Sequence, residues 1–224
     1  MAHIIGVVSQ KGGVAKSTLA RAIATAYAAS EWTVKIADMD IHQSTSYQWQ
    51  KRRLQSGIEP SVSVECFGTV SQVLKQADHY DLLIIDGSPQ ADRQTHEIAK
   101  AADMIVIPTG LSLDDLTPTV MLANALKQSG TPAKRICIAL CRTGDSKAEL
   151  EEAQDYLSQT PYHLIDGHMQ EKTAFRRAQD EGRSVIECRY PKPREQADRM
   201  VQAVINRFEE LTKSLNTELT NEGA

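Results

Sequence analysis

The 224-residue sequence is poor in aromatic residues and contains no long apolar run. Aromatic residues make up 5% of the chain, which disfavours a surface that binds nucleic-acid bases by stacking. No apolar stretch approaches the roughly 20 residues that a membrane-spanning helix needs. The amino end lacks a basic segment followed by an apolar one, the pattern of an export signal. We therefore expect a cytoplasmic protein that has no membrane as a partner.

Cysteine is also scarce. The four cysteines are Cys66, Cys137, Cys141 and Cys188, too few in a chain of this length to predict a disulfide framework. Cys137 and Cys141 lie in an apolar run over 136–141 that is typical of a strand. We therefore expect buried free thiols there, and not a metal-binding pair.

The composition is otherwise that of one globular domain, with 41% hydrophobic and 24% charged residues. The chain is long enough for an α/β domain with its own core, and it shows neither internal repeats nor an interdomain linker. We expect a single domain over 1–224, with a final helix over about 195–215 and a disordered tail over about 216–224.

The segment over 10–18, Gln-Lys-Gly-Gly-Val-Ala-Lys-Ser-Thr, has the layout of a phosphate-binding loop. It joins an apolar run over 4–8, predicted to be a buried strand, to an alanine-rich run over 19–28, predicted to be a helix. Backbone N–H groups of such a loop and helix start converge on phosphates. Lys16 would add a positive charge there, and the Ser17 hydroxyl would ligate Mg²⁺. The simpler alternative is a chance Gly-Gly turn.

The loop departs from the general pattern G-x-x-x-x-G-K-S/T in two ways: it lacks two glycines and has an additional lysine. Gln10 and Ala15 stand where the pattern has its first and last glycines. A second lysine, Lys11, lies five residues before Lys16. The minimal chemistry of a phosphate loop needs one lysine and does not explain Lys11.

Carboxylates follow two further predicted strands. Asp38 and Asp40 follow a predicted strand over 33–37, and Asp86 ends an apolar run over 82–85. Residues at i and i+2 of a strand point to the same side. At the carboxyl edge of a parallel sheet these groups would face the nucleotide crevice, where Asp86 can hold Mg²⁺ through water. The alternatives are a solvated turn at the end of the first strand, and a buried strand that ends in an aspartate by chance for Asp86.

Several segments together resemble the ParA/MinD family of ATPases. The loop over 11–18 resembles the family's K-G-G-x-G-K-S/T-T, with Ala15 as a departure. The Asp-Met-Asp at 38–40 resembles the D-x-D-P-Q motif, although Ile-His-Gln replaces Pro-Gln. The family's Walker B strand is resembled by residues 82–86 and its switch loop by residues 87–90. Its A-D-x-V-I-I-P strand is resembled by residues 102–108, and its Y-R-x-A-x-x-x-G-x-x-V segment by residues 172–187. The resemblance covers nearly the whole chain. It is nearest to small ParA-type partition ATPases, because no room precedes the loop for an amino-terminal DNA-binding domain.

The resemblance implies a fold, two cofactors and a set of site residues. The fold is α/β: a doubly wound, mainly parallel sheet of about seven strands with helices on both faces, as in P-loop NTPases. The cofactors are ATP and Mg²⁺. The implied catalytic residues are Lys11, Lys16 and Asp40, where Lys11 reaches the nucleotide of a second subunit and Asp40 activates water. The implied nucleotide-binding residues are Lys11, Gly12, Gly13, Val14, Ala15, Lys16, Ser17, Thr18, Asp86 and Pro108, and the implied metal site is formed by Ser17, Asp38 and Asp86. Cys141 and Arg142 stand where relatives often contact adenine, which leaves the adenine contacts open.

A local basic segment is the candidate DNA-binding surface. The chain has a net charge of −4, so DNA binding requires such a patch. Residues 171–194 contain seven bases and four acids, a local charge of +3. The candidate DNA-binding residues are Arg176, Arg177, Arg183, Arg189 and Lys192. An ordinary mixed surface is the alternative, and the Lys-Arg-Arg run at 51–53 is either a second candidate or a solvated helix face.

These features predict an ATP-dependent DNA-segregation (plasmid partition) ATPase. It would dimerise on ATP, bind DNA nonspecifically as a nucleoid-associated protein, and be stimulated by a ParB-like or other adaptor protein. The main alternative is a ParA-like positioning ATPase whose cargo is a protein cluster, a secretion apparatus or a relaxase–DNA complex. An enzyme that couples ATP to electron transfer, like nitrogenase iron protein, would need cysteines at a dimer axis. A nucleotide-binding scaffold without turnover stays open because of Ala15.

Overall fold

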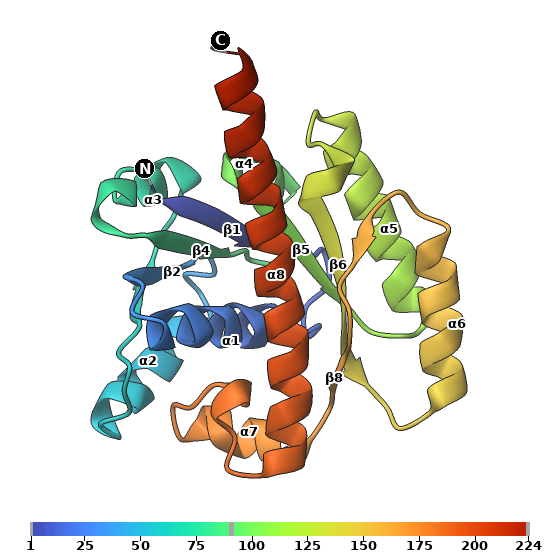
Figure 1. The fold of residues 1–224 in the computed structure, drawn as a ribbon. Coiled ribbons are helices and arrows are strands. Elements are labelled where there is room, and N and C mark those ends of the chain that lie inside the picture. The colour runs from blue at the N-terminus through green and yellow to red at the C-terminus, as the bar shows by residue number, and fades with distance from the viewer. Residues whose placement is uncertain (1, 90–91, 223–224) are drawn as a thin grey trace.

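Eight strands form a sheet in which every described strand pair is parallel (Figure 1). The computed structural model describes residues 2–89 and 92–222, with the backbone only for residue 92 and residues 214–222. The strand order is β3-β2-β4-β1-β5-β6-β7, and β8 also pairs with β6. The strands are β1 (His3–Val7), β2 (Val34–Asp38), β3 (Ser63–Cys66), β4 (Leu82–Asp86), β5 (Met104–Thr109), β6 (Ile136–Thr143), β7 (His163–Leu164) and β8 (Met169–Gln170).

Helices cover both faces of this sheet and enclose two separate cores. On one face lie α1 (Lys16–Ala29), α2 (Thr45–Gln55), α7 (Thr173–Asp180) and α8 (Pro191–Glu222). On the other lie α3 (Val70–Leu74), α4 (Asp92–Ala101), α5 (Leu113–Gln128) and α6 (Lys147–Ser158). Three 3₁₀ turns complete the described elements: η1 (Ala77–His79), η2 (Ala133–Arg135) and η3 (Val185–Glu187). The predicted doubly wound parallel fold is confirmed.

The strand β1 shows why the sheet is buried on both sides. Successive side chains of a strand point to opposite faces. Ile5 and Val7 therefore enter the core beneath α1 and α8, whereas Ile4 and Val8 enter the other core. A strand with two buried faces needs a nearly continuous apolar run, which is the pattern found at 4–8.

Strand register brings the predicted site residues to one edge of the sheet. Asp86, the last residue of β4, is paired with Val7 of β1 and with Asp38 of β2. The loop that follows β1 therefore leaves the sheet beside two carboxylates. In open α/β sheets, ligands bind outside this carboxyl edge.

The carboxyl-terminal helix is longer than the sequence pattern predicted. α8 begins at Pro191 and extends to Glu222, beyond the edge of the sheet in Figure 1. Proline is well suited to the first turn of a helix, where its missing N–H would have no intrahelical partner. The helix thus includes most of the segment expected to be a disordered tail, and residues 223–224 lie outside the described residues. Within the described chain, no helix has the length and apolarity required to cross a membrane.

Candidate functional site

A pocket of about 400 Å³ opens at the carboxyl edge of the sheet, between the loop after β1, the start of α2 and α7. It brings together predicted residues that are far apart in the sequence: Gly12, Gly13, Ala15, Lys16, Ser17, Thr18, Asp38, Asp40, Asp86 and Arg176. The glycine loop and the two carboxylate motifs at strand ends were predicted separately, and their residues line one pocket.

The loop over 10–15 has the left-handed turns that a phosphate cradle requires. Gly13 has φ 75° and Ala15 has φ 76°. Glycine adopts this conformation freely, but an alanine there costs on the order of 1–2 kcal/mol because of its Cβ. α1 begins at the next residue, Lys16, so its first N–H groups lie at the floor of the pocket. The geometry of this loop and helix start is suited to binding an anion.

Lys16 is a buried cation at the centre of this site. Only 7% of the residue is exposed, and its Nζ donates to the carbonyl oxygen of Lys11 at 2.8 Å. Desolvation lowers the pKa of Lys16, while the charges of Asp86 and Asp40 oppose that shift. A phosphate in the pocket would supply the compensating charge that the burial of this ammonium calls for.

Lys11 is directed away from its own pocket. Its Nζ lies 2.7 Å from Asp115 Oδ1, at the first turn of α5. The other carboxylate oxygen of Asp115 accepts a hydrogen bond from Ser112 Oγ at 3.0 Å. Lys11 lines a neighbouring cavity that also includes Gln10 and Gly110. The two lysines of the loop thus point to different places, and the contact with Asp115 has no signature in the sequence.

Asp86 presents one buried oxygen without a partner. Its Oδ2 accepts from Ser46 Oγ at 2.8 Å, whereas Oδ1 has no hydrogen-bond partner among the described residues. Burial, with a further contribution from the charge of Asp38, raises the pKa of Asp86 to about 6. A buried carboxylate oxygen of this kind is suited to a hydrogen bond from a Mg²⁺-bound water, so the residues present fit the implied metal.

Asp38 lines the pocket and also accepts hydrogen bonds from the backbone at the start of α2. Its Oδ1 accepts from the backbone N–H of Asp40 at 3.1 Å, and its Oδ2 accepts from the N–H groups of Ser46 and Tyr47 at 2.9 and 3.3 Å. Asp38 therefore caps α2, whose own N-cap residue, Ser44, makes no side-chain cap. Among the described residues, no group of three or more His, Cys, Asp or Glu side chains forms a metal cage.

Asp40 lies at the mouth of the pocket, half-buried. Its Oδ1 accepts from the backbone N–H groups of His42 and Gln43 at 3.2 and 3.0 Å. These bonds form a compact turn that fixes the carboxylate on the pocket side of β2. The position is suited to orienting a water molecule over a bound phosphate.

Four further residues contribute to the site: Thr45, Ser46 and Arg21, which were not predicted from the sequence, and Arg142, whose role the sequence left open. Thr45 Oγ1 donates to Ser17 Oγ at 3.0 Å, and Arg21 is buried behind Ser46. Arg142, with φ 55°, donates from its guanidinium to the carbonyl oxygen of Gly13 at 2.6 Å. The sequence offered one indication of these additional site residues, namely the basic Arg21 within an alanine-rich helix.

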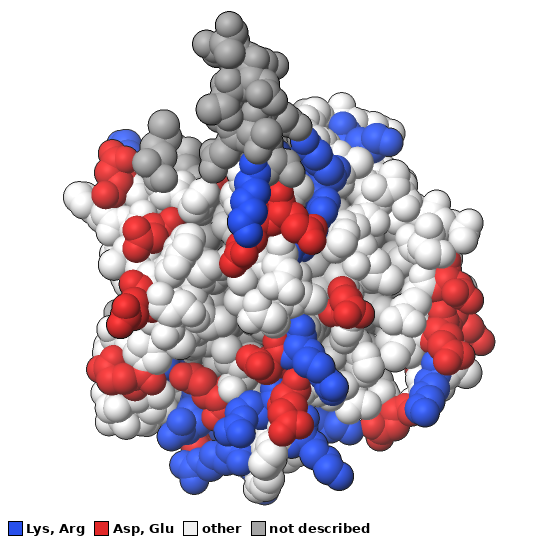
Figure 2. Space-filling view, viewed as in Figure 1, with Lys and Arg blue, Asp and Glu red and all other residues white. Residues whose placement is uncertain are grey.

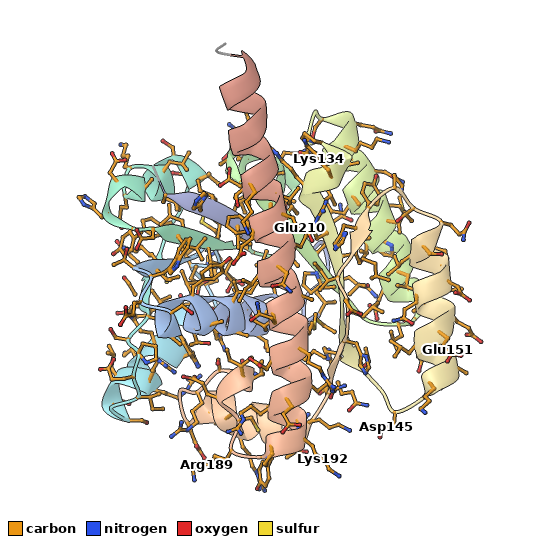
Figure 3. The ribbon with its side chains drawn as sticks, in the orientation of Figure 1. Lys134, Asp145, Glu151, Arg189, Lys192 and Glu210 are labelled. Carbon is orange, nitrogen blue, oxygen red and sulfur yellow. The ribbon has the colours of Figure 1, made fainter. Side chains whose placement is uncertain are left out.

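The predicted basic segment surrounds α7 and the start of α8, but much of its charge is paired. Figure 2 shows blue and red side chains intermixed at that end of the molecule, where Figure 3 labels Arg189 and Lys192. Arg176 pairs with Glu171 at 2.8 Å and lines the pocket, while Arg183 and Arg189 pair with Glu181 at 3.7 and 2.9 Å. Arg177 and Lys192 are exposed, and no ion pair is described for either within the part of the chain that the structure covers.

The second candidate patch, at 51–53, is not a basic surface. Arg53 is completely buried and forms a bidentate ion pair with Glu187, with both N···O distances at 2.7 Å. Its remaining N–H groups donate to the carbonyls of Pro60 and Gly182. The prediction that these three residues form either a DNA contact or a solvated face was therefore wrong for Arg53, which links α2 to the segment after α7.

Two other sequence expectations concern residues inside the sheet. Cys137 and Cys141 are free and buried in β6, where burial raises the pKa of each to about 12. Neither cysteine lies at the protein surface, where two subunits could bind a shared metal cluster. Pro108 is buried within β5, paired with Ala139, and is not among the described residues that line the pocket. Gln90 of the predicted switch loop lies outside the described residues.

Comparison with known proteins gives consistent results. Residues 5–186 match the model of the CobQ/CobB/MinD/ParA nucleotide binding domain. The chain is 29% identical over 196 residues to the "Maintenance of carboxysome distribution protein A" of Gloeobacter kilaueensis, covering 86% of this chain and 88% of that protein. Among solved structures, the cell division ATPase MinD of Pyrococcus furiosus matches with a TM-score of 0.72 at 18% identity, over 92% of this chain and 99% of that one. A putative plasmid partition protein of Borrelia burgdorferi bound to AMPPNP matches with a TM-score of 0.69 at 16% identity, over 94% and 99% of the two chains. At these identities the structural matches show the fold.

Proposed function

The chain belongs to the CobQ/CobB/MinD/ParA nucleotide-binding family, and we propose that it is an ATPase that positions cargo through a nucleotide-dependent dimer. ParA/MinD proteins are ATPases, so a general ATPase activity follows the family. The observation that carries the finer proposal is the arrangement of the two loop lysines. Lys16 is buried in the pocket, whereas Lys11 lines a neighbouring cavity and its side chain is 41% exposed.

ATP binding would use the groups that already converge in the pocket. The loop N–H groups and Lys16 bind the phosphates, and Ser17 together with Asp86 would hold Mg²⁺, Asp86 through water. The metal supplies neutralisation of charge on the β- and γ-phosphates. Asp40 orients the attacking water from the opposite side of the pocket. Replacing Asp40 with alanine should therefore preserve ATP binding and abolish hydrolysis.

Lys11 would act on the nucleotide of the partner subunit. Its ammonium is separated from its own phosphate site because it is turned toward α5. A positive group supplied in trans would stabilise the charge that develops on the transferring phosphoryl group. Since ADP lacks the γ-phosphate, hydrolysis would remove this contact and loosen the dimer.

Nonspecific DNA binding is the further part of the proposal. Arg177 and Lys192 are the exposed basic residues best able to contact phosphates, because their charges are not offset by a described ion pair. The side chain of Arg189 is 69% exposed but forms an ion pair with Glu181, and this pair would have to break before Arg189 could bind a phosphate. Dimerisation would double this surface and place the ATP-bound protein on the nucleoid, where an adaptor protein stimulates its release.

The cargo has two candidates. DNA segregation, such as plasmid partition with a ParB-like adaptor, is the function predicted from the motifs. A protein assembly is the second candidate, and one specific observation favours it: the 29% identity to a protein named for carboxysome distribution, over 86% of the chain. An adaptor that binds a defined DNA sequence would favour the first, and an adaptor that binds a protein assembly would favour the second.

Hydrolysis assays test the proposal directly. Phosphate release should be slow for the protein alone and rise when DNA and the product of an adjacent gene are both present. Lys16→Ala is the matched control for a contaminating ATPase, because it removes the buried cation of the pocket. Failure of the wild-type protein to bind ATP would refute the proposal.

A further inference from the structure

The first turn of α2 packs against the end of the pocket where Asp86 lies. Ser46, the second residue of α2, is completely buried. Its hydroxyl donates to Asp86 Oδ2 at 2.8 Å, and its backbone N–H donates to Asp38 Oδ2 at 2.9 Å. One residue thus contacts both of the buried carboxylates that end β2 and β4.

Arg21 determines the direction of the hydrogen bond that Ser46 makes. Its Nε lies 3.2 Å from Ser46 Oγ, and because a guanidinium has only N–H donors, the serine oxygen must accept. The single hydrogen of the hydroxyl is then available for Asp86 alone. Arg21 is itself held in place, since its NH1 donates to Gln179 Oε1 at 2.9 Å and its guanidinium lies 5.8 Å from the centre of the Trp49 ring.

The hydrogen bonds from Arg21 to Ser46 and from Ser46 to Asp86 account for the orientation of the Asp86 carboxylate. Rotation of the carboxylate would break the bond from Ser46 in a buried environment, where an unpaired polar group is costly. With Oδ2 held, the partnerless Oδ1 keeps a fixed position at the pocket. We propose that Ser46, oriented by Arg21, is a positioning residue that holds Asp86 for the water bound to Mg²⁺ in the nucleotide complex. This inference rests on the proposed nucleotide-binding function.

The substitution Ser46→Ala tests the role without changing any charge. It removes the hydroxyl and leaves the backbone bond to Asp38, the loop and Lys16 in place. Loss of the hydrogen-bond partner of a direct metal ligand typically lowers metal affinity 10- to 100-fold, and Ser46 lies one step further out because Asp86 contacts the metal through water. We therefore expect the free Mg²⁺ concentration that half-saturates the protein–AMPPNP complex to rise by about 3- to 10-fold, the low end of that range or below it, while the affinity for AMPPNP in EDTA stays within about twofold of wild type.

Calorimetric titration of AMPPNP at a series of free Mg²⁺ concentrations measures both quantities. Thr25→Val is the control, because Thr25 lies one turn after Arg21 on α1 and its buried hydroxyl donates to Ser184 Oγ at 2.8 Å, so the change also removes a buried hydroxyl that donates a hydrogen bond. This control should lower the thermal midpoint without moving the Mg²⁺ dependence. Ser46→Cys, which keeps the shape of the site but is a weak donor, should shift the Mg²⁺ dependence in the same direction and serves if the alanine variant does not fold.

Two results would overturn the inference. One is an unchanged Mg²⁺ dependence in folded Ser46→Ala or Ser46→Cys. The other is an equal loss of AMPPNP affinity in EDTA and in Mg²⁺, which would show a general defect of the pocket. A wild-type protein that binds AMPPNP under neither condition would instead contradict the proposed function.

Discussion

Lys11 Nζ lies 2.7 Å from Asp115 Oδ1 of the same chain. The lysine that distinguishes this phosphate loop is therefore paired with a residue on α5 when the subunit is alone. Both side chains are partly exposed, at 41% and 26%, and pairs of this kind contribute about 0–1 kcal/mol. The pair holds Lys11 in a defined position, but weakly enough for the phosphates of a partner subunit's nucleotide to replace Asp115.

Asp115→Asn should strengthen ATP-dependent dimerisation. The change removes the charge that competes for Lys11 and keeps an acceptor for Ser112. Two such pairs are released per dimer, so a gain of up to about 1 kcal/mol for each, about 2 kcal/mol in all, corresponds to a dimer dissociation constant up to about 30-fold lower. Sedimentation of both proteins with AMPPNP measures it. Asp114→Asn, an exposed neighbour, is the control for net charge, and an equal effect in both variants would exclude a specific role for Asp115.

Lys11→Ala should bind ATP but neither dimerise on it nor hydrolyse it at an appreciable rate. The reason is the position of Lys11 outside its own pocket, which leaves the internal phosphate contacts with Lys16 intact. Light scattering in ATP, ADP and AMPPNP compares the variant with the wild type, which we expect to be largely monomeric in ADP. An ATP-dependent dimer with normal turnover in Lys11→Ala would remove the proposed role in trans.

Ala15→Gly should relieve strain in the phosphate loop. The left-handed conformation of Ala15, with φ 76°, costs about 1–2 kcal/mol. A glycine at this position offsets part of that gain, because its larger conformational entropy in the unfolded chain destabilises the folded state by about 0.5–1 kcal/mol. The net expectation is a rise of up to about 1 kcal/mol in the free energy of unfolding, with faster ATP binding. Urea denaturation and stopped-flow binding measure these effects. Ala26→Gly, within α1, is the contrasting control and should lose about 1 kcal/mol.

The stability of the protein without Mg²⁺ and nucleotide should fall as the pH rises from about 4 to 6. Burial raises the pKa of Asp86 to about 6, above its ordinary value of 3.8. The folded state therefore retains a proton that the unfolded state has lost, and stability falls with pH across that interval. At 1.36 kcal/mol per pKa unit the loss is on the order of 3 kcal/mol. Denaturant unfolding of wild type and Asp86→Asn between pH 4.5 and 7.5 is the measurement, and parallel curves would disprove the assignment.

A double substitution of Arg177 and Lys192 with glutamate should weaken DNA binding and leave ATP binding intact. If each residue contacts one phosphate, the ATP-bound dimer loses four contacts, and the slope of log affinity against log salt should become shallower by about 4. Fluorescence anisotropy with duplexes of unrelated sequence gives that slope. The double variant Arg93→Glu, Lys100→Glu changes the net charge by the same amount at exposed positions on α4 and is the control. Unchanged binding in the variant of Arg177 and Lys192 would place the DNA surface elsewhere.

Features specified by short, contiguous patterns were predictable from the sequence. The phosphate loop is a strand, a glycine-containing turn and a helix in succession, and the period of apolar residues located the strands that end at Asp38 and Asp86. The parallel sheet then follows from buried strands that alternate with helices. A meeting of these carboxylates with the loop was predictable because parallel strands end at a common edge.

Contacts between distant elements were decided only by the tertiary structure. Lys11 and Asp115 are 104 residues apart, and Arg53 and Glu187 are 134 apart. No local pattern distinguishes Arg53 from its exposed neighbour Lys51, because burial of a guanidinium depends on a carboxylate that another segment delivers. The link from Arg21 through Ser46 to Asp86 likewise requires α1, α2 and β4 to pack at one point. Local sequence determines which elements form, whereas strand register and helix packing determine which polar groups those elements bring into contact.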